Sequence, residues 1–375
     1  MDRVQGMEQR PLSGIKVVET SSYLTGPYAG LQLADLGADV VKVEPPGGDP
    51  FRRFGVQNNK LSATWVSSNR GKRSMLLNLK DPADLEVALA EIATADVLIS
   101  NWRPLVAAKL GLSRETIRAL NPRIINLAIS GFGDTGEMAG KPTYDSLIQA
   151  RTGMCQYGLP EAEPSLSPIW IVDKVVGTQA AQAILAALFQ RERNNEGCDV
   201  DLAMLDATSY FNVPDMLQAR IFEGDTRPIK RTPTTMFETS DGHILICPVN
   251  GKQMSNTLDA IGKSLLKQEL TSISHPVERT EAFNREVAAV VKTRTSEEWL
   301  NLFDLHDVPA GPVWTIDEHL NDPAVEHNEI YSFIGNEGDK MRAARYPAIF
   351  NGQKLTPEYT PLRIEPVDTE KGSKK

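Results

Sequence analysis

Two parts of this sequence could carry chemistry: a glycine-rich stretch and an acidic residue at the entrance of a long helix. Residues 131–142 read GFGDTGEMAGKP and follow a β-branched run. A glycine-rich loop after a strand belongs at the carboxyl edge of a sheet, where open α/β sheets bind their ligands. Asp173 precedes KVVGTQAAQAILAALFQRER, whose apolar spacing is typical of a helix. The sequence thus offers a candidate ligand loop and a candidate carboxylate.

The opening of the chain imitates a dinucleotide-binding motif without matching it. Gly26 and Gly30 are followed by Glu44 at the end of a second β-branched run. The pyrophosphate fingerprint, however, requires G-x-G-x-x-G in the tight turn between strand and helix. The turn here reads ETSSYLTGPYAG, which is longer and bulkier. We therefore do not expect nicotinamide or flavin binding.

Three further kinds of site lack their motifs. The sequence has no GxxxxGK[ST], no G-x-S-x-G, and no H-x-x-x-H or H-E-x-x-H among its histidines, the first of which is His243. These motifs cradle the phosphates of ATP, present a hydrolase serine and hold zinc, respectively. Metal catalysis is therefore not expected.

Alternating strands and helices must position the candidate residues. IKVVE from Ile15, a helix that Thr25 can cap and Gly37 can end, and DVVKVE form a βαβ unit. The alternation continues with strands at 74–79, 96–100 and 123–129 and a helix at 81–93. Such alternation predicts a mostly parallel sheet with helices on both faces.

A second domain follows a change in composition. Residues 221–235 are rich in charge, Pro and Thr and read as a linker. Beyond them, DGHILICPV predicts a strand, and helices are expected at 253–261, 281–292 and 297–305. This smaller unit is α+β in character.

The composition is that of an ordinary folded protein, with 41% hydrophobic and 24% charged residues among 375. The net charge of -9 disfavours binding to nucleic acid or to anionic membranes. The first residues, MDRVQGMEQR, lack the apolar core of a signal peptide, and we expect no run of the ~18 apolar residues that a spanning helix needs. We therefore expect a cytoplasmic protein with no membrane partner.

Seven segments of the sequence, in family order, resemble motifs of the family III CoA transferases, the group of the formyl-CoA and carnitine CoA transferases. They are PLSGIKVVETSSYLTGPYAGLQLADLGADVVKVEPPGGDPFRR, NRGKRSMLLNLKDP, NWRP followed by LGLS, NPRIINLAISGFGDTG, KPTYDSLIQARTGM, GTQAAQAILAALFQR and VPAGPVWTIDEHLNDP. The resemblance extends from about residue 11 to residue 350.

The resemblance implies that Asp173 is a nucleophile, because the family's catalytic aspartate stands in the context that here reads IVDKVVGTQAAQAILAAL. A helix N-terminus favours an ionised carboxylate, the form that a nucleophile needs. The implied reaction moves CoA from an acyl-CoA thioester to a free carboxylic acid. It passes through aspartyl anhydride and aspartyl-CoA thioester intermediates and needs no tightly bound cofactor. Taken alone, Asp173 reads as an ordinary helix cap.

The resemblance also implies the surroundings of the nucleophile. Gly131, Gly133 and Gly136 could present backbone amides to oxyanions, and Tyr144 and Asp145 match a Tyr-acid pair near the family's active site. Seven polar residues at loop ends are candidates for contacts with CoA: Arg70, Lys72, Arg73, Asn101, Arg103, Lys109 and Lys141. Of these, Asn101 matches a family contact most closely. Taken alone, the basic residues read as solvated surface charges.

The implied fold class is α/β, with a Rossmann-like large domain, a mostly parallel sheet and a smaller α+β domain. We expect the first part of the large domain at 1–222, the small domain at 223–330, and a return segment at 331–375 that completes the large domain. In the family, two such subunits are interlocked in a homodimer. The expected partners are thus an acyl-CoA, a carboxylic acid acceptor and a second copy of the chain.

Two other functions stay open. An α-methylacyl-CoA racemase shares the fold but uses a His and an Asp, and residues 1–242 contain no histidine. A non-catalytic CoA-binding protein would not need a carboxylate at Asp173. Two departures from the family are visible. RTPTTMFETSDG replaces a multi-glycine loop, which disfavours an oxalate-type enzyme, and TPLRIEPVDTEKGSKK replaces a closing helix.

Overall fold

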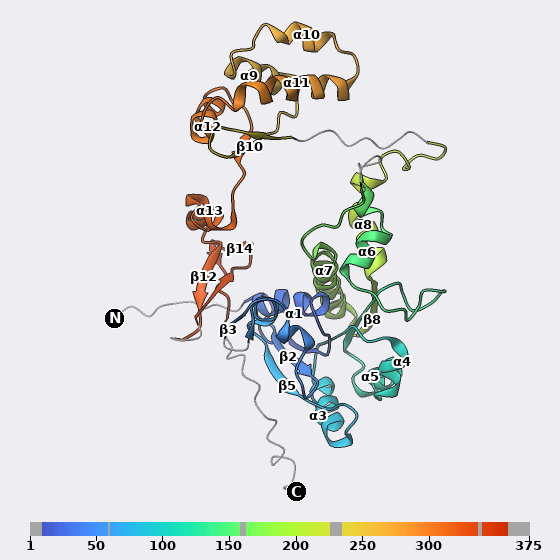
Figure 1. The fold of residues 1–375 in the computed structure, drawn as a ribbon. Coiled ribbons are helices and arrows are strands. Elements are labelled where there is room, and N and C mark those ends of the chain that lie inside the picture. The colour runs from blue at the N-terminus through green and yellow to red at the C-terminus, as the bar shows by residue number, and fades with distance from the viewer. Residues whose placement is uncertain (1–9, 59–60, 158–162, 226–234, 337–339, 359–375) are drawn as a thin grey trace. The chain divides into compact units, whose positions relative to one another are not determined.

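The structure is a computed structural model that describes residues 10–58, 61–157, 163–225, 235–336 and 340–358. The chain forms two units, residues 1–227 with 329–375 and residues 228–328. The sequence placed the boundaries at 222/223 and 330/331, within a few residues of this division. The second unit is thus inserted into the sequence of the first (Figure 1).

The large unit is built on a six-stranded sheet in the order β5-β2-β1-β6-β7-β8 (Figure 1). All five neighbouring pairs are parallel. This is the order 3-2-1-4-5-6 of doubly wound folds, which reverses direction between β1 and β6. The predicted α/β fold with a parallel sheet is confirmed. The strands are β1 (Lys16–Glu19), β2 (Asp39–Glu44), β5 (Arg73–Leu76), β6 (Val97–Ser100), β7 (Ile125–Ser130) and β8 (Cys198–Ala203).

Two apolar cores lie on opposite faces of this sheet. Val17 packs into the core that contains residues of α1 (Thr25–Asp35), α7 (Ile171–Asn194) and α8 (Met204–Met216). Its neighbour Val18 packs into the other core, with α3 (Pro82–Ala93) and α5 (Arg114–Leu120). Alternate strand residues face opposite sides. The near-continuous apolar strands are therefore buried on both faces, as a parallel sheet requires.

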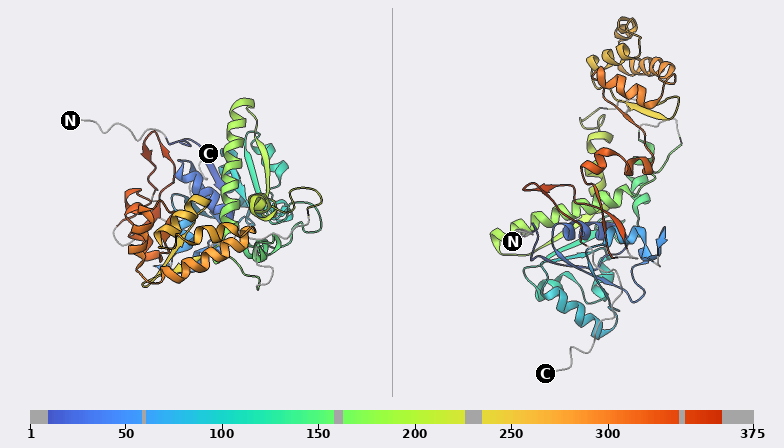
Figure 2. Two further views of the ribbon diagram at one scale, coloured as in Figure 1. Left: turned by 90° about the horizontal axis from the view of Figure 1, so that it is seen from above. Right: turned by 90° about the vertical axis from the view of Figure 1, so that its left-hand side faces the viewer.

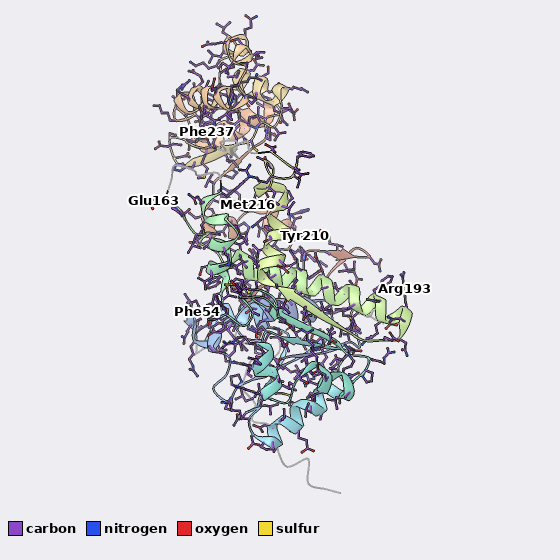
Figure 3. The ribbon with its side chains drawn as sticks, turned by 90° about the vertical axis from the view of Figure 1, so that its right-hand side faces the viewer. Phe54, Glu163, Arg193, Tyr210, Met216 and Phe237 are labelled. Carbon is purple, nitrogen blue, oxygen red and sulfur yellow. The ribbon has the colours of Figure 1, made fainter. Side chains whose placement is uncertain are left out.

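Helix α7 is the longest of the described part of the chain and runs beside α1 over the sheet (Figure 2). Arg193 marks its far end in Figure 3. Among the described residues it alone has the length and composition to cross a membrane, contrary to our expectation of no such run. Val176, Ala180 and Ile184 are nevertheless fully buried in the large unit's core. A core helix passes the same test of length and composition.

Shorter elements complete the large unit. Its helices are α2 (Ala63–Asn69), α4 (Pro104–Lys109), α6 (Asp145–Arg151) and the 3-10 turns η1 (Pro50–Arg53) and η2 (Met154–Gln156). Its two-stranded ladders are β3 (Gln57–Asn58) with β4 (Leu61–Ser62), β12 (Tyr331–Ile334) with β13 (Met341–Ala344), and β14 (Ile349–Phe350) with β15 (Gln353–Lys354).

The return segment is tied to the first part of the chain by hydrogen bonds. Arg70 donates to the carbonyl of Ala344 at 2.8 Å, and Arg10 donates to the carbonyl of Thr356 at 2.8 Å. Arg10 also pairs with Glu358 at 3.1 Å. The last described residues of the chain therefore belong to the large unit.

The small unit packs helices around an antiparallel three-stranded sheet in the order β11-β10-β9. Its core includes Phe237, Phe283, Trp299 and Phe303. The sheet consists of β9 (Met236–Glu238), β10 (His243–Ile246) and β11 (Ala310–Pro312). The helices are α9 (Gly251–Ala260), α10 (Leu266–Ser272), α11 (Pro276–Val291), α12 (Ser296–Leu305), α13 (Ile316–Leu320) and α14 (Pro323–His327). The unit is α+β, as expected.

Candidate active site

A cavity of about 330 Å³ opens at the carboxyl ends of the central strands of the large unit. Its walls come from the loops after β1, β6 and β7, from the first residue of α8 and from Asp173. The side chain of Asn101 joins the loops after β1 and β6, because it accepts from the amide of Ser22 at 3.1 Å and donates to its carbonyl at 3.0 Å. The cavity therefore lies at the point where the strand order reverses, where doubly wound folds bind ligands.

Asp173 projects into this cavity from the first turn of α7. The hydroxyl of Thr25, at the start of α1, donates a hydrogen bond to its Oδ1. Its own backbone amide donates to Oδ2 of Asp145 at 3.1 Å. The starts of three helices, α1, α6 and α7, thus meet around one carboxylate.

The environment of Asp173 makes it a weaker acid than usual. Burial raises its pKa from 3.8 to about 6, and the charge of Asp145 adds to the rise. The Thr25 hydrogen bond and the charge of Lys174 oppose it. The sequence indicated that the helix N-terminus would keep this carboxylate ionised, but desolvation outweighs that effect. With a pKa near 6 the group is still mostly ionised at pH 7, and it is a stronger base than an ordinary Asp.

Asp145 is a buried support for the nucleophile candidate. Its Oδ1 accepts from Gln149 Nε2 at 2.5 Å, and Gln149 in turn accepts from the amide of Ser167 at 2.9 Å. Asp145 and Gln149 are each at least 96% buried. This relay connects α6 to the segment that leads into α7, so it helps to fix the position of Asp173.

The glycine-rich loop forms another wall of the cavity. Gly131, Gly133 and Gly140 line it, whereas the predicted Gly136 does not. Gly131 lies against Thr143, where a Cβ would come within 2.2 Å of the threonine methyl, so only glycine fits. Gly133 has a φ of +90°, and its amide donates to Ser130 Oγ at 3.0 Å. The Gly133 amide can therefore hold an oxyanion only after it leaves Ser130 Oγ.

Aromatic side chains border the site on the side of Asp173. Tyr144 meets Tyr23 edge-on, with ring centroids 5.6 Å apart, and Tyr23 has a φ of +66°. The ring centroid of Tyr23 lies 6.4 Å from that of Phe51. The ring of Phe51 in turn lies 5.8 Å, between centroids, from that of Trp170, three residues before Asp173. Phe54 stacks on Phe51 at 5.4 Å and is half exposed (Figure 3). Of these side chains Tyr23 and Tyr144 line the cavity, and their rings reduce the space open to water beside the carboxylate.

Three of the seven predicted CoA contacts line the cavity: Asn101, Arg103 and Lys141. Arg103 is exposed and donates to the carbonyl of Gly140 at 3.3 Å. Arg103 and Lys141 are the cations at this opening, and their charges suit the phosphates of CoA. The side-chain amide of Asn101, by contrast, is hydrogen-bonded to the backbone of Ser22 and holds the loop after β1.

The structure does not bring the other four to the cavity. Lys72 is buried, and its ammonium contacts Glu19 at 2.7 Å. Arg70 is buried in a bidentate pair with Asp35. The charges of Lys72 and Arg70 are thus compensated inside the protein. These two basic residues, which the sequence suggested as contacts for CoA phosphates, form buried ion pairs instead. Arg73 pairs with Asp39 at the surface at 2.7 Å, and Lys109 ends α4.

A larger cavity, of about 1410 Å³, lies elsewhere in the large unit, between α1, α2 and residues 340–347. Arg70 lines it, but Asp173 does not. We therefore place the chemistry in the smaller cavity, where the carboxylate with the raised pKa lies.

Sequence reasoning missed Thr25 and the aromatic wall. Thr25 was expected to cap α1, but the cap position is Leu24, and the Thr25 hydroxyl donates to Asp173, 148 residues away. The missed signal was the polar run SSYLT between strand and helix, which is too long for a tight turn. Polar residues in such a loop at a sheet's carboxyl edge are candidates for a site.

The sequence model of CoA-transferase family III matches residues 12–362. The chain belongs to this family. The resemblance inferred from the motifs is thereby confirmed, and the family is one of enzymes that act on CoA thioesters.

Characterised and solved relatives agree with this assignment. The succinate--glutarate CoA-transferase of Agrobacterium fabrum is 33% identical, over 95% of this chain and 91% of the relative. The acetyl-CoA:oxalate CoA-transferase of Acetobacter aceti is 32% identical, over 84% and 83%. The crystal structure of a CAIB/BAIF family protein from Brucella suis, 28% identical, superposes with a TM-score of 0.85 over 95% of this chain and 97% of that one. These similarities support CoA-transferase activity for this member of the family.

Proposed function

We propose that this chain is a CoA transferase in which Asp173 forms covalent intermediates with the acyl group and with CoA. The observation that carries the proposal is the position of Asp173. It is a carboxylate with a pKa of about 6, in a cavity whose walls supply two cations, a glycine loop and an aromatic border. An acid that only caps a helix needs none of these.

The reaction proceeds by exchange of bonds at three carbonyl carbons: that of the donor acyl group, Cγ of Asp173 and that of the acceptor. A carboxylate oxygen of Asp173 attacks the thioester carbon, the C–S bond breaks, and an anhydride forms with release of the CoA thiolate. The thiolate attacks Cγ of Asp173, the Cγ–O bond to the donor breaks, and the donor acid leaves from an aspartyl-CoA thioester. The acceptor carboxylate then attacks Cγ, the Cγ–S bond breaks, and a second anhydride forms with release of the thiolate. The thiolate attacks the acceptor's carbonyl carbon, whose bond to the bridging oxygen breaks, and that oxygen stays on Cγ. These last steps give the new acyl-CoA and restore Asp173.

The other residues hold the reactants and exclude water. Arg103 and Lys141 bind CoA phosphates at the opening, the amide of Gly131 serves the oxyanions, and that of Gly133 does so once it leaves Ser130 Oγ. Tyr23 and Tyr144, which line the cavity, shield the anhydride from hydrolysis. The acyl groups exchanged are of similar energy, so the cycle consumes no ATP.

We propose short dicarboxylic acids as the substrate class. The relatives reported above are named for succinate, glutarate and oxalate. The cavity of about 330 Å³ is small and polar enough in its lining to suit such acids. The missing multi-glycine loop favours the longer acids over oxalate, because it marks a departure from the formyl-CoA transferases.

We further propose an interlocked homodimer in the cytoplasm. Helix α8 exposes Tyr210, labelled in Figure 3, and Phe211. Their accessible fractions are 78% and 49%. A second copy would cover such aromatic surface. Sedimentation at decreasing concentration tests this: a dimer is expected throughout, and a folded species of 41.2 kDa would contradict it.

Mass spectrometry tests the covalent route. The protein is mixed with a panel of short dicarboxylyl-CoA thioesters, digested and compared with Asp173→Ala. We expect a CoA or acyl adduct on the peptide that contains Asp173, absent from the variant. Thermal stabilisation by CoA without any adduct or turnover would indicate a binding protein. Deuterium uptake at the α-carbon of a methylacyl-CoA without an adduct would indicate a racemase.

A further inference from the structure

Thr25 occupies an unusual position for a residue at the start of a helix. It is the first residue of α1, directly after the cap residue Leu24, and is 7% exposed. Its hydroxyl donates to Oδ1 of Asp173. Within the described part of the chain, no other side chain hydrogen-bonds to that carboxylate.

The packing of α1 against α7 fixes this contact. Gly177 stands one turn after Asp173 on α7, and a Cβ there would lie 2.7 Å from the carbonyl oxygen of Thr25. At Gly26, the next residue of α1, a Cβ would lie 2.2 Å from Ser21 Oγ. The two glycines let the start of α1 come close to both α7 and the end of β1. This close packing therefore fixes the distance between the Thr25 hydroxyl and Asp173.

The two oxygens of Asp173 have different fates in the proposed reaction, on which this inference rests. One oxygen attacks the thioester and becomes the bridging oxygen of the anhydride. The other becomes the carbonyl oxygen of the aspartyl group. When the CoA thiolate attacks Cγ, this second oxygen takes the negative charge of the tetrahedral intermediate, and it does so again when the acceptor carboxylate attacks.

We propose that Thr25 is the positioning residue that assigns these roles: its hydroxyl holds Oδ1 as the carbonyl oxygen, leaves Oδ2 to attack, and donates to the oxyanion that develops on Oδ1. A hydroxyl already aimed at this atom needs no reorganisation when the charge develops. The glycine loop serves the oxyanion on the substrate carbonyl, so the two tetrahedral centres have separate donors. The loss of Thr25 should then slow the steps at Cγ most.

The test uses two substitutions of Thr25 and one matched control. Thr25→Val keeps the shape and removes the hydroxyl, whereas Thr25→Ser keeps the hydroxyl. Thr178→Val removes a hydroxyl from the same helix as Asp173, where it accepts from Gln32 at 3.4 Å and does not touch the carboxylate. Thr25→Ala replaces the Val variant if circular dichroism shows that Val is not accommodated.

Each protein is mixed with one acyl-CoA that labels the wild type and quenched over time at several pH values, without an acceptor. For Thr25→Val we expect the aspartyl-CoA adduct to form about 100-fold more slowly, the typical effect of one lost oxyanion donor. The acyl adduct should become the larger fraction. The apparent pKa of the pH–rate profile should rise, because the Thr25 hydrogen bond that is lost lowers the pKa of Asp173. Thr25→Ser should restore most of the rate, and Thr178→Val should react as the wild type does.

Two results would overturn the inference. One is a wild-type rate and pH profile for Thr25→Val. The other is a slow Thr25→Ser, which would assign Thr25 a packing role. A wild-type protein that forms no adduct with any thioester would instead refute the proposed function itself. Because the wild type is measured first, the two failures are distinguishable.

Discussion

The large unit holds two sets of buried carboxylates, and they differ in their partners. Glu19, at the end of β1, contacts Lys42 at 2.8 Å and Lys72 at 2.7 Å, and all three side chains are nearly inaccessible. Burial alone would raise the pKa of Glu19, but the two lysines hold it below its usual value. At Asp173, burial raises the pKa, the hydrogen bond from Thr25 only partly opposes the rise, and the charge of Asp145 adds to it.

The difference teaches which buried acid is structural. The Glu19 cluster fixes the loop that leads to the site, because Lys42 also donates to the carbonyl of Ser21 at 2.8 Å. Its charges are matched, so it is a framework. Among the described residues no cation lies as close to Asp173 as Lys42 and Lys72 lie to Glu19. The uncompensated charge costs stability and leaves a reactive oxygen available. We therefore expect opposite results when each acid is neutralised.

Neutralising Asp173 should remove activity and spare the fold. For Asp173→Asn we expect turnover to fall on the order of 10³-fold or more, because the neutral amide of Asn cannot attack the thioester to form the anhydride. The melting temperature should stay level or rise, since a poorly compensated buried charge is lost. Calorimetry and a CoA-transfer assay on the same sample check both. Retention of more than a few per cent of the activity would show that Asp173 is not the nucleophile.

Neutralising Glu19 should have the reverse effect. Glu19→Gln leaves Lys42 and Lys72 buried with too little negative charge, and we expect a loss of about 3–5 kcal/mol in the free energy of unfolding. Urea denaturation measures it. Asp39→Asn, which breaks the exposed pair with Arg73, is the matched control and should cost under about 1 kcal/mol. Equal effects of the two substitutions would remove the distinction between framework and surface pairs.

Lowering the pH should also distinguish Asp173 from the Glu19 cluster. Because the pKa of Asp173 is about 6, adduct formation should fall about tenfold for each pH unit below 6. A folded-state pKa above the ordinary 3.8 means that Asp173 costs stability as pH rises from about 4 to 6. The stability advantage of Asp173→Asn at pH 7.5 should therefore vanish below pH 4. A rate that stays flat down to pH 4.5 would contradict the raised pKa.

The cations at the cavity opening should have the smallest effect. Lys141→Ala and Arg103→Ala should each raise the KM for acyl-CoA about 3–10-fold with little change in kcat, since an exposed charge binds phosphate but does not touch the reacting atoms. Lys109→Ala, a cation outside the cavity, is the control. The assay is repeated at high salt, which should reduce the difference. An unchanged KM in both cavity variants would place the phosphates elsewhere.

The sequence predicted the fold better than the partners of its charged residues. The β-branched runs and helix signals located β1, β2, β6 and α7, because apolar burial leaves a periodic pattern. The short helices α4 and α5 were not anticipated. The strand order could not be read locally, since it depends on which strands pair after the chain has folded.

Asp173, Tyr144 and Asp145 could be placed at one site because the motifs around them match a family, not because of spacing. Lys72 was misleading for a physical reason. A buried lysine in an ion pair and a solvated lysine look the same in a sequence, and its partner Glu19 is 53 residues away. Thr25 was expected to cap a helix for a similar reason, since its partner lies on another helix.

The inserted small unit has a consequence for how the protein is made. The residues that line the site cavity, from Ser22 to Met204, leave the ribosome before the small unit is synthesised. The carbonyls that Arg10 and Arg70 require, on Thr356 and Ala344, emerge only after the small unit. A nascent chain thus carries every residue that lines this cavity while two of its arginines still lack these acceptors, and the segment that follows the small unit supplies them.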